Sequence, residues 1–288
     1  DTVEKAVDDL CEGGKIICRP IANVQGCYLR RMYEAETYVA KRLWAACTEE
    51  CEHWVDAGKI ISEIEMQQGV VYAPLQRHAV TLAAEKGVLV LTGGPGTGKT
   101  TAVRGIVTLF ERMGLSVLLL APTGRAAQRM GQLCGRDAQT IHRSLGMSYN
   151  ELTGEVNFRK NEKEPLECDA VIVDEMSMVD VVLMRGLLRA ILPGTRLILV
   201  GDADQLPSVG AGNVLHDILA SDAVPNVRLC DIFRQDESSM IVLNAHRINH
   251  GEMPVLKRRD TDFFFEKKTL QSEAAKTICQ LLQTRLPK

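Results

Sequence analysis

From about residue 74 to residue 200, short continuous apolar runs alternate with stretches whose apolar residues recur at helical spacing. Continuous apolar runs of this length are typical of strands that are buried on both faces. Such runs lie at residues 88–91, 117–120, 170–173 and 197–200. Helices are predicted at 75–86, 99–113, 124–133 and 179–191. The alternation predicts an α/β fold with a parallel sheet that is covered by helices.

The first 72 residues have a different pattern and are expected to form a small, mainly helical domain. Strand-like runs at Lys15–Cys18 and Gly26–Leu29 flank Pro20, and a long helical pattern covers roughly residues 30–54. A second, shorter helix is expected over residues 57–66. Nothing in this region points to chemistry, so its apolar stripe is interpreted as packing surface.

Composition limits the possible partners. The chain has 288 residues, 45% hydrophobic and 25% charged, which is ordinary for globular proteins. Its net charge of −3 gives no overall basic field, so a nucleic-acid surface would have to be local. No apolar stretch approaches the length of a membrane span, and no membrane partner is expected.

The cysteines favour a reduced, cytoplasmic protein, because nine of them show no paired C-x-x-C framework. Cys47, Cys51 and His53 lie close together, and a metal cluster is one interpretation of them. Since no second ligand pair follows, we expect the two cysteines to lie on one helical face instead. The chain begins at Asp1 without a methionine, which suggests an excised fragment.

A glycine-rich stretch, GGPGTGKTT, lies between the first apolar strand and the following helix. Gly93, Gly98, Lys99 and Thr100 have the G-x-x-x-x-G-K-[ST] spacing of a phosphate-binding loop. The N–H groups of such a loop donate to a polyphosphate, the lysine lies between the β- and γ-phosphates, and the threonine hydroxyl binds Mg²⁺. The residues expected around the nucleotide are Gly94, Pro95, Gly96, Thr97, Gly98, Lys99, Thr100 and Thr101.

Polar side chains follow two other predicted strands. Asp174 and Glu175 come directly after the strand at 170–173, where one carboxylate suits Mg²⁺ and its neighbour suits proton transfer from an attacking water. Gln205 lies just beyond the strand at 197–200, within reach of a γ-phosphate. An acidic pair favoured by a helix dipole and a solvated polar turn are the plainer alternatives. Because ligands of parallel sheets bind beyond the carboxyl ends of the strands, all these groups are expected together.

Seven stretches, in this order, resemble the motifs of superfamily 1 DNA helicases, and within them the RecD-like branch. They are GGPGTGKTT at 93–101, APTGRAA at 121–127, TIHR at 140–143, VDEMSMVD at 173–180, VGDADQLPSVG at 200–210, IFRQ at 232–235 and NAHRINHG at 244–251. The resemblance covers about residues 75–254; the YEAE at 33–36 is similar to the family's N-terminal helical region, less specifically. It implies a RecA-like P-loop NTPase domain that uses ATP and Mg²⁺ to move 5′ to 3′ along single-stranded DNA and at duplex junctions.

The resemblance also assigns roles by position. By this resemblance, Gln76 is expected to bind the edge of the adenine and Gln205 to sense the γ-phosphate. Arg234 is expected to approach the γ-phosphate across a cleft. For Arg234 a surface salt bridge is the plainer alternative. Catalytic roles are thereby expected for Lys99, Glu175, Gln205 and Arg234, and magnesium-binding roles for Thr100 and Asp174.

Two turns and one hairpin look like contacts to a nucleic-acid track. Thr123, Gly124 and Arg125 form a turn after a strand that can present a hydroxyl, a backbone N–H and a guanidinium to a phosphate. Thr140 and His142 lie at another helix start, and similar residues in the family touch single-stranded DNA. Taken alone, His142 is as well explained as a structural histidine. Residues 147–166 resemble the family's β-hairpin pin, although the sequence itself indicates only a polar hairpin with a turn near 152–155.

We therefore expect an N-terminal domain at 1–72, a first motor domain at 73–228, and the truncated start of a second motor domain at 229–288. The family's later motifs have no counterpart here, so the chain is expected to bind nucleotide and to hydrolyse it poorly. The alternatives are a nucleotide-binding module without motor activity, an RNA-remodelling superfamily 1 helicase, and the helicase part of a conjugative relaxase.

Overall fold

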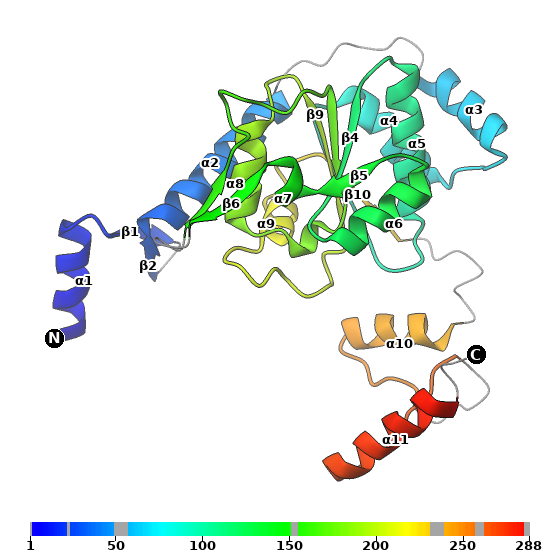
Figure 1. The fold of residues 1–288 in the computed structure, drawn as a ribbon. Helices are drawn as coiled ribbons and strands as arrows, with labels where there is room; N and C mark the ends of the chain where they lie inside the picture. The colour runs from blue at the N-terminus through cyan, green and yellow to red at the C-terminus, as the bar shows by residue number, and fades with distance from the viewer. Residues whose placement is uncertain are drawn as a thin grey trace. The chain divides into compact units, whose positions relative to one another are not determined.

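The computed structural model describes residues 2–21, 24–48, 57–150, 155–230, 239–256 and 262–284. By their internal contacts these fall into two compact units, residues 1–231 and residues 232–288, and each is described by itself. The elements are labelled in Figure 1.

The first unit is built around a six-stranded parallel sheet with the strand order β10-β3-β9-β8-β4-β5. Its strands are β3 (Val88–Gly93), β4 (Val117–Ala121), β5 (Ala138–Thr140), β8 (Ala170–Val173), β9 (Arg196–Gly201) and β10 (Asn226–Leu229). Every residue of β3, β8 and β9 is buried, which explains their unbroken apolar sequences. The predicted α/β fold with a parallel sheet is confirmed.

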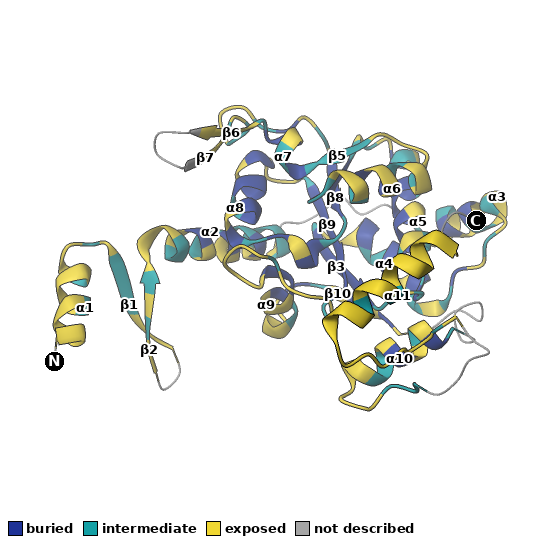
Figure 2. Cartoon of the chain, turned by 60° about the horizontal axis from the view of Figure 1, so that its bottom comes forward, coloured by how far each residue is buried: buried dark blue, intermediate teal, exposed yellow. Residues whose placement is uncertain are grey.

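Helices cover both faces of this sheet. They are α4 (Pro74–Glu85), α5 (Lys99–Arg112), α6 (Gly124–Cys134), α7 (Ile141–Ser144), α8 (Val181–Ala190) and α9 (Val214–Ser221), with a 3₁₀ turn, η1 (Met176–Met178), before α8. Neighbouring residues of β3 belong to different apolar cores: Val88 and Val90 pack with α8 and α9, whereas Leu89 and Leu91 pack with α4 and α5. The central strands β3, β8 and β9 are consequently buried along their whole length and dark blue in Figure 2, whereas β5 is only partly buried and β10 is exposed at alternate residues.

The N-terminal part of this unit contains α1 (Thr2–Glu12), the antiparallel hairpin β1 (Ile16–Ile21) and β2 (Val24–Leu29), α2 (Arg30–Thr48) and α3 (Ala57–Gln68). Helix α2 buries Ala35, Val39 and Leu43, which are spaced four residues apart, in the core it shares with α8. Its predicted continuation to residue 54, together with Cys51 and His53, lies outside the described residues.

Two differences from the sequence-based expectations have physical reasons. The predicted helix at 179–191 begins at Val181, because the Asp180 carboxylate caps it by accepting from the Leu183 N–H at 2.8 Å. Strand β10 was not expected, because only Val227 and Leu229 of its four residues are buried and no continuous apolar run results. It lies at the edge of the sheet beside β3.

The predicted hairpin is present as β6 (Met147–Asn150) paired antiparallel with β7 (Glu155–Phe158), whereas its turn at 151–154 lies outside the described residues. The second unit contains α10 (Met240–Asn249) and α11 (Gln271–Thr284). Within it the Asn244 side chain accepts from the Val255 N–H at 2.7 Å and donates to the Val255 carbonyl at 3.1 Å. Among the described helices, none has the length and apolarity that a membrane crossing needs.

Candidate nucleotide site

The glycine-rich loop joins β3 to α5 in the way its sequence predicts. Gly96 and Gly98 have φ angles of 75° and 79°, a left-handed conformation that glycine adopts without strain, and α5 begins at the next residue. The Lys99 ammonium donates to the carbonyls of Gly93 and of Gly94, the latter at 2.9 Å. The buried Thr97 hydroxyl donates to the same Gly94 carbonyl at 2.9 Å. The lysine and the first turn of α5 are therefore held against the backbone of the loop.

The charges of three carboxylates act on this lysine from the ends of neighbouring strands. Strand β9 lies between β3 and β8, so Asp202 at the end of β9 lies between the loop and the residues that follow β8. Burial lowers the pKa of Lys99, and the charges of Asp202, Asp174 and Glu175, in that order, oppose the shift. The sequence-based expectation that Lys99, Asp174 and Glu175 gather at one edge of the sheet thus matches the structure.

The two carboxylates after β8 lie in a partly buried turn. The Glu175 N–H donates to Asp174 Oδ1 at 2.9 Å, and Glu175 has a φ angle of 56°, which is uncommon for a residue with a side chain. Burial raises the pKa of both carboxyl groups, and the negative charge of Asp174 raises that of Glu175 further. A partly buried carboxyl group with a raised pKa near a lysine is a candidate for proton transfer.

Two residues near the site were not singled out from the sequence. Asp202 is 4% exposed, and its carboxylate accepts from the Asp204 N–H at 3.0 Å and from the Gln205 side chain at 3.4 Å. It follows a buried strand, the same signal that pointed to Asp174. The second is Arg129 of α6, whose charge lowers the pKa of both Asp174 and Glu175. An exposed arginine on a helix gives no signal in the sequence.

Gln76 lies in the first turn of α4 and contacts the backbone of the glycine-rich loop. Its side chain is 2% exposed; its amide N–H donates to the Gly98 carbonyl at 3.2 Å, and its oxygen accepts from the Ala73 N–H at 3.0 Å. The amide therefore joins the start of α4 to the loop. Its expected contact with adenine stays a prediction.

The other expected residues occupy three places. Thr100 is exposed on the first turn of α5, and Gln205 is exposed in the loop after β9. Thr123 and Thr140 cap α6 and α7 by accepting from N–H groups at 3.3 and 3.1 Å. These caps follow β4 and β5, which pair so that Ala121 lies opposite Thr140, and Gly124, Arg125 and His142 lie in the first turns of the same helices. Arg234 lies outside the described residues.

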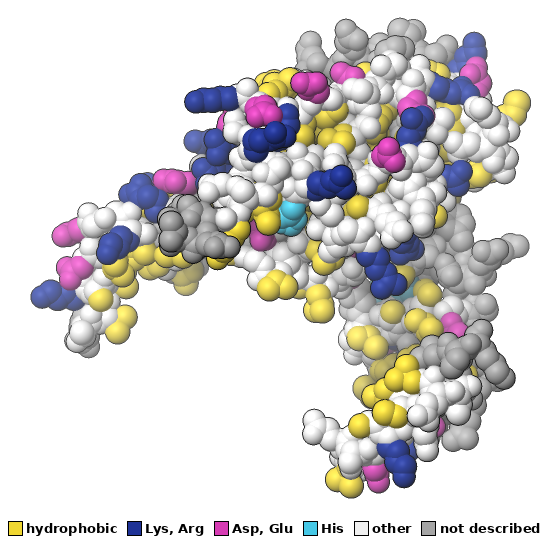
Figure 3. All heavy atoms as spheres, in the orientation of Figure 1, with side chains coloured by type: hydrophobic (Ala, Val, Ile, Leu, Met, Phe, Trp, Pro, Cys, Tyr) yellow, Lys and Arg dark blue, Asp and Glu magenta, His cyan; other side chains and the backbone are white. Residues whose placement is uncertain are grey.

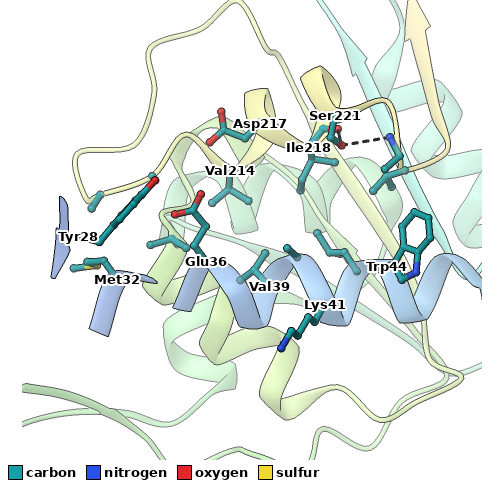
Figure 4. Close-up of a pocket in the computed structure, with 17 residues that line it drawn as sticks. Tyr28, Met32, Glu36, Val39, Lys41, Trp44, Val214, Asp217, Ile218 and Ser221 are labelled. Atoms are coloured by element: carbon teal, nitrogen blue, oxygen red, sulfur yellow. Dashed lines mark hydrogen bonds between the residues drawn. The ribbon is translucent and has the colours of Figure 1, made fainter. Parts of the chain in front are cut away.

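A separate apolar cavity of about 640 Å³ lies between α2 and α9. Figure 4 shows side chains of α2 and of α9 lining this cavity, among them Val39 and Trp44 of α2 and Val214 and Ile218 of α9. None of the expected nucleotide or nucleic-acid residues lines it. The cavity is therefore distinct from the edge of the sheet that carries the phosphate-binding loop.

Gly93 gives a direct test of the loop's packing. A Cβ at this position would lie 2.7 Å from the Leu229 carbonyl oxygen and 2.7 Å from Thr97 Oγ1. Relieving these contacts would require the backbone of β10 or the buried Thr97 hydroxyl to move, which costs free energy. We expect Gly93→Ala to destabilise the chain by about 1–3 kcal/mol, the usual cost of overpacking, and to weaken nucleotide binding. Denaturant unfolding and titration with a fluorescent ATP analogue measure both effects.

The matched control is Gly58→Ala in the first turn of α3, where a Cβ would meet nothing within 4 Å. Because alanine favours helix over glycine, this variant should be neutral or up to about 1 kcal/mol more stable. Equal stability of the two variants would contradict the packing argument at Gly93.

Comparisons with known proteins agree with this geometry. Residues 76–211 match a family model described as an AAA domain. The ATP-dependent RecD2 DNA helicase of Deinococcus radiodurans is 47% identical over 203 residues, which are 70% of this chain and 26% of that protein. The RecBCD enzyme subunit RecD of Mycobacterium tuberculosis is 42% identical over 167 residues, 50% of this chain and 28% of that protein. The chain thus spans about a quarter of the length of these curated relatives.

Among solved structures, the Pif1 helicase of Candida albicans is 22% identical, with a TM-score of 0.47 over 75% of this chain and 55% of that one. By its sequence identity to RecD2 and RecD, the chain belongs to the RecD-like helicases.

Proposed function

We propose that the protein couples ATP hydrolysis to 5′-to-3′ movement on single-stranded DNA, as an ATP-dependent DNA helicase. The observation that carries the proposal is the gathering of Lys99 with Asp174, Glu175 and Asp202 at the carboxyl edge of one parallel sheet. Such an edge binds ligands in parallel α/β proteins, and a lysine-bearing glycine loop there binds polyphosphate. The helicase relatives supply the substrate class.

The side chains fit Mg·ATP chemically. Mg²⁺ prefers hard oxygen ligands, which the Thr100 hydroxyl and the Asp174 carboxylate would provide. The bound ion would neutralise charge on the phosphates. Lys99 would offset the negative charge that develops on the transferred phosphoryl group, and Glu175 would take the proton from the attacking water. Gln205 would sense the γ-phosphate from a loop that is tied to α8 by the Val181 N–H bond to the Ala211 carbonyl, at 3.0 Å.

The expected DNA contacts lie at the carboxyl ends of the two strands farthest from β10. Thr123 and Thr140 each use an oxygen lone pair to cap a helix and keep a hydroxyl hydrogen that can be donated to a phosphate. The exposed Arg125 supplies positive charge beside Thr123. On the face shown in Figure 3, Lys and Arg side chains lie among Asp and Glu, in line with the small net charge, so binding would depend on such local contacts.

We expect a bell-shaped pH dependence of kcat/KM for ATP, which reports groups of the free protein. Burial raises the pKa of Glu175, so activity should fall with decreasing pH at a value above that of an ordinary glutamate. Burial lowers the pKa of Lys99, so activity should fall with increasing pH before an ordinary lysine titrates. A steady-state pH profile measures both limbs. If Glu175→Gln kept the acidic limb, Glu175 would not be the group that causes it.

The proposal is tested by ATP hydrolysis of the complete gene product with no nucleic acid, with single-stranded DNA and with RNA. We expect DNA to stimulate turnover and RNA to have no comparable effect. Stimulation by RNA alone would favour an RNA-remodelling enzyme, and hydrolysis or binding without any stimulation would favour a nucleotide-binding module. Strand displacement from duplexes with a 5′ or a 3′ overhang then tests the direction.

A further inference from the structure

Three cysteines meet where α1 packs on the β1–β2 hairpin, far along the chain from the nucleotide site. Cys11 lies in the last turn of α1, and Cys18 and Cys27 lie directly opposite each other in the two strands. The Cys18 sulfur is 2.7 Å from the Cys11 sulfur and 3.5 Å from the Cys27 sulfur. The closer pair is only about 0.7 Å beyond the length of a disulfide bond.

The three thiols differ in exposure, and the central one has a raised pKa. Cys27 is exposed, whereas Cys11 and Cys18 are partly exposed. Hydrogen bonds to Cys11 and then to Cys27 raise the pKa of the central Cys18 thiol to about 12. Because the thiolate is the reactive form of cysteine, the raised pKa disfavours first attack by Cys18. Its position between the other two sulfurs makes it the partner in the bond that follows.

The spacing is unsuitable for a metal ion. Zinc binds thiolates at about 2.3 Å in a tetrahedral arrangement, which keeps two ligating sulfurs about 3.8 Å apart. The sulfurs of Cys11 and Cys18 are more than 1 Å closer than this. Within the part of the chain that the structure describes, no group of three or more potential ligands is arranged to hold a metal.

We propose that Cys11, Cys18 and Cys27 form a redox-active thiol site, in which a hydroperoxide such as hydrogen peroxide converts Cys11 and Cys18 to a disulfide. A flanking thiolate attacks the peroxide, breaks its O–O bond and becomes a sulfenic acid, with release of hydroxide. That hydroxide takes the proton of the Cys18 thiol to give one water, and the Cys18 sulfur then displaces hydroxide from the sulfenic acid, which takes up a proton to give the second water. In total, two thiols and one peroxide yield one disulfide and two waters. The shorter sulfur distance makes Cys11 the favoured partner, and Cys27 can exchange into the bond.

The disulfide would fix helix α1 on the β1–β2 hairpin, which precedes the six-stranded sheet in the chain. Helix α1 has no buried residue, so few packing contacts hold it on the hairpin. A disulfide would close a short loop between α1 and β1, and the hairpin continues directly from Leu29 into α2, which shares a core with α8. The inference is independent of ATP hydrolysis, because no residue of the nucleotide site takes part.

The test treats the purified, reduced chain with a small excess of hydrogen peroxide, alkylates the remaining thiols, and maps the tryptic peptides by mass spectrometry. Trypsin cuts after Lys15 and Arg30 but poorly between Arg19 and Pro20, so Cys11 falls in one peptide and Cys18 with Cys27 in another. We expect a linked pair of peptides, about 2 Da lighter than their sum, with two thiols lost and both regained on treatment with dithiothreitol. The other half-buried thiols Cys47, Cys134 and Cys168 should react slowly, because burial raises the pKa of each.

Single variants identify the bonded sulfurs, with circular dichroism confirming that each is folded. Cys27→Ser should keep the linked peptides, and Cys18→Ser should lose them. Cys11→Ser should give an internal Cys18–Cys27 bond in one peptide instead. The control Cys279→Ser, which changes an exposed cysteine of α11, should behave as wild type. Linked peptides that persist in Cys18→Ser, oxidation of Cys279 while Cys11 and Cys18 stay alkylatable, or one zinc ion per chain that Cys18→Ser loses, would each overturn the proposal.

Discussion

Replacement of Lys99 by alanine is expected to weaken Mg·ATP binding by about 10- to 100-fold and to lower turnover by a further factor of about 10²–10³. A hydrogen bond to a charged group contributes about 1.5–3 kcal/mol, which gives the first factor, and loss of one electrostatic contact to the transition state typically gives the second. The variant also removes the ammonium group on which the charges of Asp202, Asp174 and Glu175 act. Titration with a fluorescent ATP analogue and steady-state hydrolysis measure the two effects.

The fold should survive this change, because the lysine's two hydrogen bonds in the structure go to loop carbonyls and not to the apolar cores. Lys59→Ala is the matched control, since this exposed lysine lies on α3. It should bind and hydrolyse ATP as wild type does. Unchanged turnover in Lys99→Ala would remove the loop from the mechanism, whereas loss of the circular dichroism signal would instead identify a structural role for the lysine.

The sequence predicted the strands best where burial on both faces leaves no polar position. The strands that carry the loop and Asp174 are of this kind, and their apolar runs coincide with β3 and β8. Strand β10 gave no such signal because half of its residues face solvent at the edge of the sheet. The sequence analysis did not predict helix α1. None of its residues is buried in the structure, so its apolar side chains belong to no hydrophobic core.

For the site, the sequence predicted which strand ends would meet but not how the side chains are held there. Lys99 and Asp174 could be brought together from the strand–loop–helix pattern alone. The contact of Gln76 with the Gly98 carbonyl could not, because it depends on how α4 packs behind the loop. Arg129 was missed for the same reason: it approaches the carboxylates from α6, and only the packing of that helix brings its charge near them.

Replacement of Glu175 by glutamine is expected to separate binding from chemistry. Glutamine has the shape of glutamate but cannot accept the proton of the attacking water, and loss of a general base costs about 10²–10⁴ in rate. ATP binding should be retained or tightened, because the change removes one negative charge from beside Asp174 and from the place expected to hold the phosphates. The backbone should tolerate the change, since the Glu175 N–H, not its side chain, makes the bond to Asp174.

Single-turnover hydrolysis and equilibrium ATP binding measure the two halves of this prediction. Glu167→Gln, at an exposed carboxylate just before β8, is the control for loss of charge and should leave both unchanged. If Glu175→Gln lost binding together with turnover, the carboxylate would serve to hold the left-handed turn after β8. If it kept full turnover, another group would have to accept the proton, and Asp202 is the candidate, because it is the buried carboxylate that acts most strongly on Lys99.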